Sequence, residues 1–229
     1  HCKVFAKDFL ALFYPSLCII CASNLLKHEE CICISCLHQT PKTDCFINSK
    51  NDVSERFWGR IQLENAAALF DFNKDGNAQK LIHQLKYEEG KNVGIFLGKQ
   101  LAYAINESEC FNNIDIVIPV PLHSKKQKLR GYNQSDFIAK GIKEILDIKV
   151  NKQSLIRIEN TDSQTRKKRF SRWENMMNSF DLRSSKKLKG KHILLVDDVI
   201  TTGSTLEACA QKLQEVEGVK VSIATIAVA

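Results

Sequence analysis

The feature that most constrains the fold of this chain is an apolar run that ends in two adjacent carboxylates. Residues 192–196 are typical of a β-strand that is buried on both faces, as in parallel sheets. Asp197 and Asp198 follow, then a loop rich in hydroxyl groups, and then a segment with an apolar face of helical spacing. That face consists of Leu206, Cys209, Ala210 and Leu213. A strand, a loop and a helix in this order predict an α/β fold with a ligand site at the carboxyl ends of its strands.

The loop has the chemistry of a phosphate site. Backbone N–H groups at a helix N-terminus bind anions, and Gly203 allows a close backbone approach or a positive φ. Additional donors are the hydroxyls of Thr201, Thr202, Ser204 and Thr205. Asp197 and Asp198 have the wrong charge for phosphate but accept hydrogen bonds from sugar hydroxyls, so the segment predicts a ribose 5-phosphate site. A plain strand, turn and helix cap is the alternative, although one cap residue explains only one hydroxyl.

Residues 196–205 resemble the phosphoribosyl pyrophosphate (PRPP) signature of type I phosphoribosyltransferases. The resemblance implies that Asp197 and Asp198 hold the ribose hydroxyls as the catalytic pair. It implies that the 5-phosphate is bound by Val199, Thr201, Thr202, Gly203, Ser204 and Thr205. Mg²⁺ is expected with PRPP, because protein sites hold this ion mainly through substrate phosphates and one or two carboxylates. The chain has neither a P-loop motif nor a dinucleotide-binding glycine motif after a strand.

The cysteines predict a small module at the amino end of the chain. Seven of the nine cysteines lie within the first 45 residues. Four of them form two C-x-x-C pairs, Cys18 with Cys21 and Cys33 with Cys36. Such pairs offer four thiolates to one tetrahedral Zn²⁺, and a segment this short needs a metal or another staple to fold. We therefore expect a structural zinc ribbon, with Cys31 as an alternative to Cys33 and with redox-active or buried thiols as other interpretations.

Length and composition predict one ordinary domain with a small appendage. The 229 residues are 44% hydrophobic, which is enough for a core. We expect a zinc-ribbon module over residues 1–40, a polar linker over 41–60, and an α/β domain over 61–229 with a mainly parallel sheet of about five strands flanked by helices. No apolar run approaches the roughly 20 residues of a membrane span, and we expect a cytoplasmic protein. The net charge of +7 suits an anionic ligand, either a phosphorylated sugar or a nucleic acid.

A second strand-to-loop transition lies at residues 114–134. Its strand is followed by several cations, which is where the charge of a pyrophosphate can be met. A solvated basic loop is the alternative for Lys125, Lys126 and Lys128. The polar segment 161–175 has the length and composition of a lid. Candidates for pyrophosphate or lid contacts are Leu122, His123, Ser124, Arg130, Lys86, Gln164 and Arg172.

The segments 118–122 and 130–134, with the double C-x-x-C pattern before them, resemble the ComF family of competence-associated, phosphoribosyltransferase-like proteins. The resemblance extends to residues 155–157 and to Gln164, Arg172, Asn175 and Phe180, so it covers nearly the whole chain. Cys31 and Cys45 depart from the family pattern. The resemblance implies a zinc ribbon ahead of a type I phosphoribosyltransferase domain and a link with transformation competence or DNA uptake.

Three functions are compatible with these patterns. The first is Mg²⁺-dependent transfer of phosphoribosyl from PRPP to an unidentified acceptor, such as a nitrogen base. The second is a PRPP- or nucleotide-sensing protein without turnover, which acts through a partner in the competence machinery. The third is binding of single-stranded DNA or RNA through the ribbon and the basic, aromatic run 166–173, although such a run is also typical of a solvated face.

Overall fold

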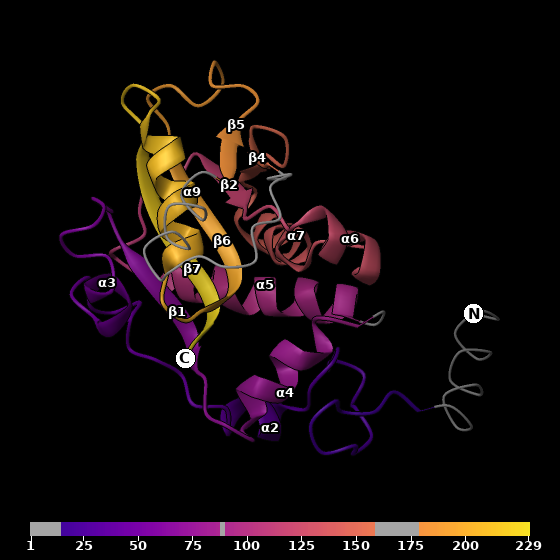
Figure 1. Ribbon diagram of the computed structural model, residues 1–229. Helices are drawn as coiled ribbons and strands as arrows, with labels where there is room; N and C mark the ends of the chain where they lie inside the picture. The colour runs from indigo at the N-terminus through magenta and orange to yellow at the C-terminus, as the bar shows by residue number, and fades with distance from the viewer. Residues whose placement is uncertain (1–14, 88–89, 159–178) are drawn as a thin grey trace, which may run out of the picture.

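A computed structural model describes residues 15–87, 90–158 and 179–229 of the chain (Figure 1). Its centre is a five-stranded sheet in the order β1-β7-β6-β2-β3, and every pair of neighbouring strands is parallel. The strands are β1 (Ala66–Asp71), β2 (Ile116–Pro119), β3 (Lys149–Val150), β6 (His192–Ile200) and β7 (Lys220–Val228). The predicted fold class, a mainly parallel α/β sheet, is therefore confirmed.

The central strand β6 owes its place to the apolar run recognised in the sequence. Residues 193–196 are fully buried, and β7 beside it has seven consecutive buried residues. Strands covered on both faces lose the alternation of polar and apolar residues. The paired carboxylates therefore lie at the carboxyl end of the third of five strands, as the sequence predicts.

Helices cover both faces of the sheet. The long helices are α5 (Gly90–Glu107), α7 (Gln134–Leu146) and α9 (Ser204–Gln214). The crossovers through α5 and α7 run along the sheet in one direction and that through α9 in the other, so right-handed connections put α9 on the opposite face. The helices α5 and α7 touch backbone to backbone, since a Cβ on Gly98 would collide with the carbonyl oxygen of Ile138 and one on Gly141 with that of Ile95.

Shorter elements complete the described part of the chain. They are α2 (Ile34–His38), α3 (Asp52–Glu55), α4 (Asn77–Gln84), α6 (Ser124–Arg130) and the antiparallel pair β4 (Leu155–Arg157) and β5 (Phe180–Leu182). Among the described helices, none combines the length and the apolar character that crossing a membrane would require.

Residues 41–60, predicted as a linker, pack along the outer edge of β1. Lys42 forms an antiparallel bridge with Phe70, and the Asn51 side chain donates to the carbonyl oxygen of Ala66 at 3.1 Å. Asn51 also caps α3, while Val53 and Phe57 are buried. The polar residues that suggested a linker thus bond to a sheet edge and a helix end. The division of the chain at residues 40 and 60 stays a prediction.

Candidate functional site

The carboxylate pair lies in the part of β6 that extends past the end of its neighbour β2. β2 is paired with β6 only as far as Pro119, which is opposite Val196, so Asp197 and Asp198 extend beyond the end of β2. The Asp198 N–H donates to Asp197 Oδ1 at 2.9 Å, and the Val199 N–H donates to Asp198 Oδ1 at 2.8 Å. Asp198 is buried and Asp197 half-buried. The two carboxyl groups are held by their own backbone at the sheet edge where a ligand is expected.

The N-terminal turn of α7 holds both carboxylates from the side. Ser135 Oγ donates to Asp197 Oδ1 at 2.8 Å, and Gln134 Nε2 donates to Asp198 Oδ2 at 3.3 Å. Arg130 donates in turn to Gln134 Oε1 at 2.9 Å. A chain of hydrogen bonds therefore joins a predicted pyrophosphate residue to the carboxylate pair. Ser135 was not among the predicted site residues, because its contact depends on the packing of α7 against β6.

The environment of Asp197 favours its protonated form. Burial, followed by the adjacent charge of Asp198, raises the pKa of Asp197 to about 8, although the hydrogen bond from Ser135 acts in the opposite direction. Without a ligand, the pair therefore carries less than two negative charges near neutral pH. A cation or a set of hydroxyl donors placed here would favour loss of the remaining proton.

The hydroxyl-rich loop has the predicted turn. Gly203 has a φ of 76° and precedes α9, and a Cβ at this position would lie 3.0 Å from the Phe57 ring. Thr202 Oγ1 and Ser204 Oγ are 3.1 Å apart. Thr201 and Thr202 are exposed, whereas Ser204, Thr205 and Val199 are half-buried. The loop can therefore present hydroxyls and backbone at the start of an 11-residue helix, which is the geometry of an anion site.

Two arginines outside the predicted domain contact the back of this loop. Arg56 donates to the carbonyl oxygen of Thr201, and Arg60 donates to that of Thr202 at 3.2 Å. Arg60 also forms an ion pair with Glu207, whose side chain is 2% exposed. Carbonyl oxygens that would repel a phosphate are thus directed to cations. No local pattern in the sequence predicts the ion pair between Arg60 and Glu207, because the two residues are 147 positions apart.

The predicted pyrophosphate residues follow β2 and surround α6. Leu122, His123 and Ser124 are half-buried at the start of α6, where His123 Nδ1 accepts from the Lys125 N–H at 3.2 Å. Lys86 is half-buried just after α4. Gln164 and Arg172, and the proposed lid that contains them, lie outside the described residues.

Tyr132 links the segment around Lys86 to the loop before α7 by hydrogen bonds. Its hydroxyl group is within hydrogen-bond distance of the carbonyl oxygens of Leu85, at 2.7 Å, and Tyr87. The backbone on each side of Lys86 is therefore tied to the segment that carries Arg130 and Gln134. Whether any of these side chains contacts a pyrophosphate stays a prediction.

Arg157 on β4 is a further basic group, whose charge acts on the buried thiol of Cys209. Its Nε atom is buried without a hydrogen bond, and its guanidinium carbon lies 5.1 Å from the centre of the Phe180 ring. Burial raises the pKa of the Cys209 thiol; the Asp197 charge adds to this effect and the Arg157 charge opposes it. Arg157 was noted in the sequence only as part of the family resemblance.

The amino-terminal cysteines form one compact group, which we call the cysteine cluster: Cys18, Cys21, Cys33 and Cys36. Their sulfur atoms all lie within 4.8 Å of one another. Cys33 caps α2, and its Sγ accepts from the Cys36 N–H at 3.4 Å. Of the two candidates left open by the spacing, Cys33 is in the cluster and Cys31 is not.

Comparisons with known proteins agree with this geometry. Residues 133–228 match the family model of the phosphoribosyl transferase domain. DNA utilization protein YhgH of Salmonella typhimurium is 32% identical over 136 residues, which are 58% of this chain and 59% of that protein. Competence protein F of Haemophilus influenzae is 32% identical over 139 residues, which are 59% of this chain and 61% of that protein.

A third relative carries the name of the family that the sequence resembles. Competence protein ComFC of Bacillus subtilis is 34% identical over 100 residues, which are 44% of this chain and 38% of that protein. The resemblance to ComF proteins is therefore confirmed. The chain spans about three fifths of the length of the first two relatives.

Proposed function

We propose that this chain binds PRPP with Mg²⁺ at the carboxyl end of β6 and transfers the phosphoribosyl group to a nitrogen acceptor. The observation that carries the proposal is the meeting of Asp197 and Asp198 with the loop 201–205 at one sheet edge. The two halves suit the ribose hydroxyls and the 5-phosphate of a single molecule. The match to the phosphoribosyl transferase domain supports this proposal.

In the proposed reaction, the acceptor nitrogen forms a bond to C1 of the ribose while the bond from C1 to the pyrophosphate oxygen breaks. Positive charge develops on the ribose ring, and Asp197 and Asp198 stabilise it electrostatically while they accept hydrogen bonds from its hydroxyls. Ser135 and Gln134 keep the two carboxylates in place. Pyrophosphate leaves with the electron pair of the broken bond. Arg130, the cation at the end of the hydrogen-bond chain through Gln134, is the predicted partner of its negative charge.

The carboxylate pair fits the ligand preference of Mg²⁺. This ion takes oxygen ligands and is usually held by one or two carboxylates together with substrate phosphates and waters. When bound, it would neutralise charge on the departing pyrophosphate. Asp197 or Asp198 would supply the protein ligand.

We infer that the cysteine cluster binds one structural Zn²⁺. A tetrahedral site with Zn–S bonds of about 2.3 Å has sulfur atoms roughly 3.8 Å apart, and Cys21 Sγ and Cys33 Sγ are 3.8 Å apart. Four cysteine sulfurs within 4.8 Å of one another are close to such an arrangement. The names of the relatives, competence protein and DNA utilization protein, suggest that the chain serves DNA uptake or use.

The test is calorimetric titration of PRPP with and without Mg²⁺. Replacing both carboxylates, as Asp197→Asn with Asp198→Asn, should weaken binding about a hundredfold or more, because hydrogen bonds to charged groups contribute about 1.5–3 kcal/mol each. Asp71→Asn is the matched control, since Asp71 is an exposed carboxylate at the end of β1, which β7 separates from β6 in the sheet. Equal affinity in the double variant and the control would contradict the proposal.

Turnover is tested separately by pyrophosphate release against a panel of nitrogen bases. Release that depends on the base and disappears in the double variant supports transfer. Tight PRPP binding without release from any base would favour the sensing function instead.

A further inference from the structure

A large hollow lies at the end of the sheet opposite the carboxylate pair. Its volume is about 1240 Å³, and it opens beside the edge strand β3. Ile116, the first residue of β2, and Lys191, the residue before β6, contribute to its wall. The remaining wall comes from the second half of α7, the turn 151–154 and the segment 183–187. Because all strands of the sheet are parallel, the hollow and the PRPP site lie at opposite strand ends.

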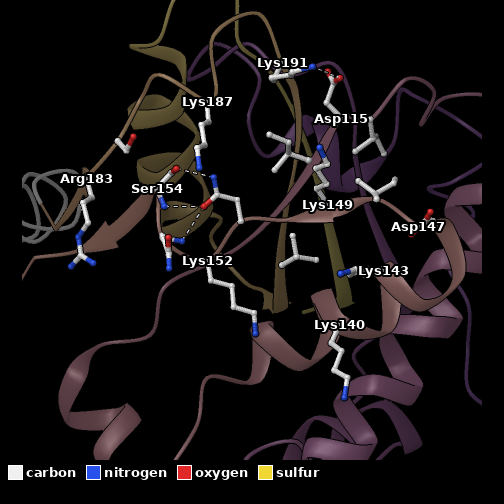
Figure 2. Close-up of a pocket in the computed structure, with 17 residues that line it drawn as sticks. Asp115, Lys140, Lys143, Asp147, Lys149, Lys152, Ser154, Arg183, Lys187 and Lys191 are labelled. Atoms are coloured by element: carbon white, nitrogen blue, oxygen red, sulfur yellow. Dashed lines mark hydrogen bonds and ion pairs between the residues drawn. The ribbon is translucent and has the colours of Figure 1, made fainter.

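The hollow is strongly cationic. Seven of the 33 lysine and arginine side chains of the protein line it: Lys140, Lys143, Lys149, Lys152, Arg183, Lys187 and Lys191 (Figure 2). Only two acidic residues, Asp115 and Asp147, share the lining. Figure 2 shows that the labelled cations surround the hollow and come from three separate segments of the chain.

Within the described residues, most of these cations have no ion-pair partner. Lys191 pairs with Asp115 at 2.8 Å, and Lys152 pairs with Asp136 at 3.4 Å. The other five cations make no ion pair with any carboxylate of the described residues. Five like charges around one concave surface repel one another, so an anion bound there relieves an existing electrostatic cost.

The backbone beneath the cations is fixed by hydrogen bonds. Asn151 Oδ1 accepts from the N–H groups of Gln153 and Ser154 at 3.0 Å, and Asn151 Nδ2 donates to Ser154 Oγ at 2.8 Å. The Arg183 N–H donates to the Ser154 carbonyl oxygen at 2.8 Å, which joins the turn to the segment that carries Lys187. The backbone of the turn 151–154 and its link to Arg183 are therefore held in place by hydrogen bonds.

We propose that this hollow binds the phosphodiester backbone of nucleic acid without regard to base sequence. Lys, Arg, Asn, Gln and Ser side chains, which line it together, are the types that contact phosphates in protein–nucleic acid complexes. Among the described residues, the lining contains no aromatic side chain, so these residues offer no platform for stacked bases. The described part of the lining also contains none of the exposed large hydrophobic residues, which a membrane surface or a protein partner would use as anchors.

The proposal rests on charge and shape at the amino ends of the strands and is independent of PRPP binding. Fluorescence anisotropy with labelled single-stranded and duplex DNA of mixed sequence should show binding that weakens steeply with salt. If the five unpaired cations each meet a phosphate, the slope of log K against log salt is about −3.5 for single strands and about −4.5 for duplex.

Two triple variants with equal change in charge make the test specific to the hollow. The groove variant is Lys140→Glu, Lys149→Glu, Lys187→Glu, with one substitution in each of the three segments. The control variant is Lys50→Glu, Lys74→Glu, Lys80→Glu, whose lysines are also exposed but lie outside the lining. The groove variant should lose about tenfold or more in DNA affinity and about two units of salt slope, and it should keep its PRPP affinity.

Each other outcome overturns the assignment. Equal loss in both triple variants would mean that the overall charge, and not the hollow, attracts DNA. Failure of the unaltered protein to bind either form of DNA would exclude nucleic acid as the ligand. Binding of tripolyphosphate or polyglutamate to the hollow, with no displacement by DNA, would assign it to another anion.

Discussion

Residues 15–40, which contain the cysteine cluster, and the five-stranded sheet are stabilised by different interactions. Residues 15–40 contain one helix of five residues. Few of their side chains are buried, and two of the buried ones are cysteines of the cluster. In the sheet, β7 alone has seven consecutive buried residues. Apolar burial at about 25 cal/mol per Å² stabilises the second region, whereas the first is too small to fold by burial alone. The stabilities of the two regions should therefore respond to different treatments.

The two regions nevertheless touch. Asn77 Nδ2 donates to the Cys36 carbonyl oxygen at 3.3 Å, and Lys99 pairs with Glu30 at 2.9 Å. Only the latter is an ion pair, and its side chains are partly exposed, so it contributes little. Cys18, Ile32 and Cys36 also belong to the same apolar cluster as the core of the sheet. We expect each region to lose its structure without unfolding the other, because most buried apolar residues belong to the sheet and its helices.

The largest effect is expected from the cysteine cluster. Cys33→Ser should abolish zinc binding and hydrogen-exchange protection over residues 15–40, because structural zinc contributes about 10–16 kcal/mol to the folding of small modules. Metal analysis and hydrogen exchange measure both results, and protection in β6 and β7 should persist. Cys31→Ser is the matched control and should retain zinc, since Cys31 lies outside the cluster. Full zinc retention in Cys33→Ser would contradict the assignment.

The converse effect is expected from the core of the sheet. Leu195 is fully buried in β6, and Leu195→Ala should lower the free energy of unfolding by about 2–5 kcal/mol. Urea denaturation measures the change, and the Leu195→Ala variant should still bind zinc when it is folded. Leu129→Ala, at a residue 88% exposed, should change stability by less than about 0.5 kcal/mol. Loss of zinc in native Leu195→Ala would show that the two regions are coupled.

A smaller effect is expected where residues 41–60 meet the phosphate loop. Arg60→Ala leaves the buried carboxylate of Glu207 without its partner and should cost about 1–3 kcal/mol. The double variant Arg60→Ala, Glu207→Gln should recover part of that stability, because a neutral amide is less costly to bury. Denaturation measures stability, and PRPP titration should show weaker binding in both variants. Equal stability of the two variants would argue against the ion pair.

The smallest effect concerns pH. The pKa of Asp197 is raised to about 8, whereas an unfolded Asp titrates near about 4. The folded form thus keeps a proton that the unfolded form releases, so this group contributes stability below about pH 4 that is lost as the pH rises through about 8. Asp197→Asn should therefore match the unaltered protein at low pH and melt at a higher temperature above pH 8, because the amide has no proton to release.

Scanning calorimetry without Mg²⁺ measures this pH dependence. Asp71→Asn, which removes an exposed carboxylate, is the control and should show no such trend. A difference in Tm between Asp197→Asn and the unaltered protein that stays constant from low to high pH would contradict the prediction.

Local patterns predicted the parts of the site that are continuous in the chain. The strand β6, the turn at Gly203 and the helix α9 lie within one stretch, so their order and spacing reveal them. The contacts of Ser135 and Arg60 join segments far apart in the chain, and no local pattern encodes them. The division of residues 41–60 from the domain stays a prediction, because polar side chains that bond to a sheet edge are also typical of a linker.

The position of β1 has a consequence for how the molecule is made. β1 is synthesised before the other strands of the sheet, yet within the described residues its sheet neighbour is β7, the last of the five along the chain. A ribosome therefore releases β1 long before that partner exists, and the bridge between Lys42 and Phe70 covers only its other edge. The sheet can close only after translation has passed β7, so a nascent chain carries one unpaired edge on a strand whose first five residues are apolar, and such an edge invites aggregation during that interval.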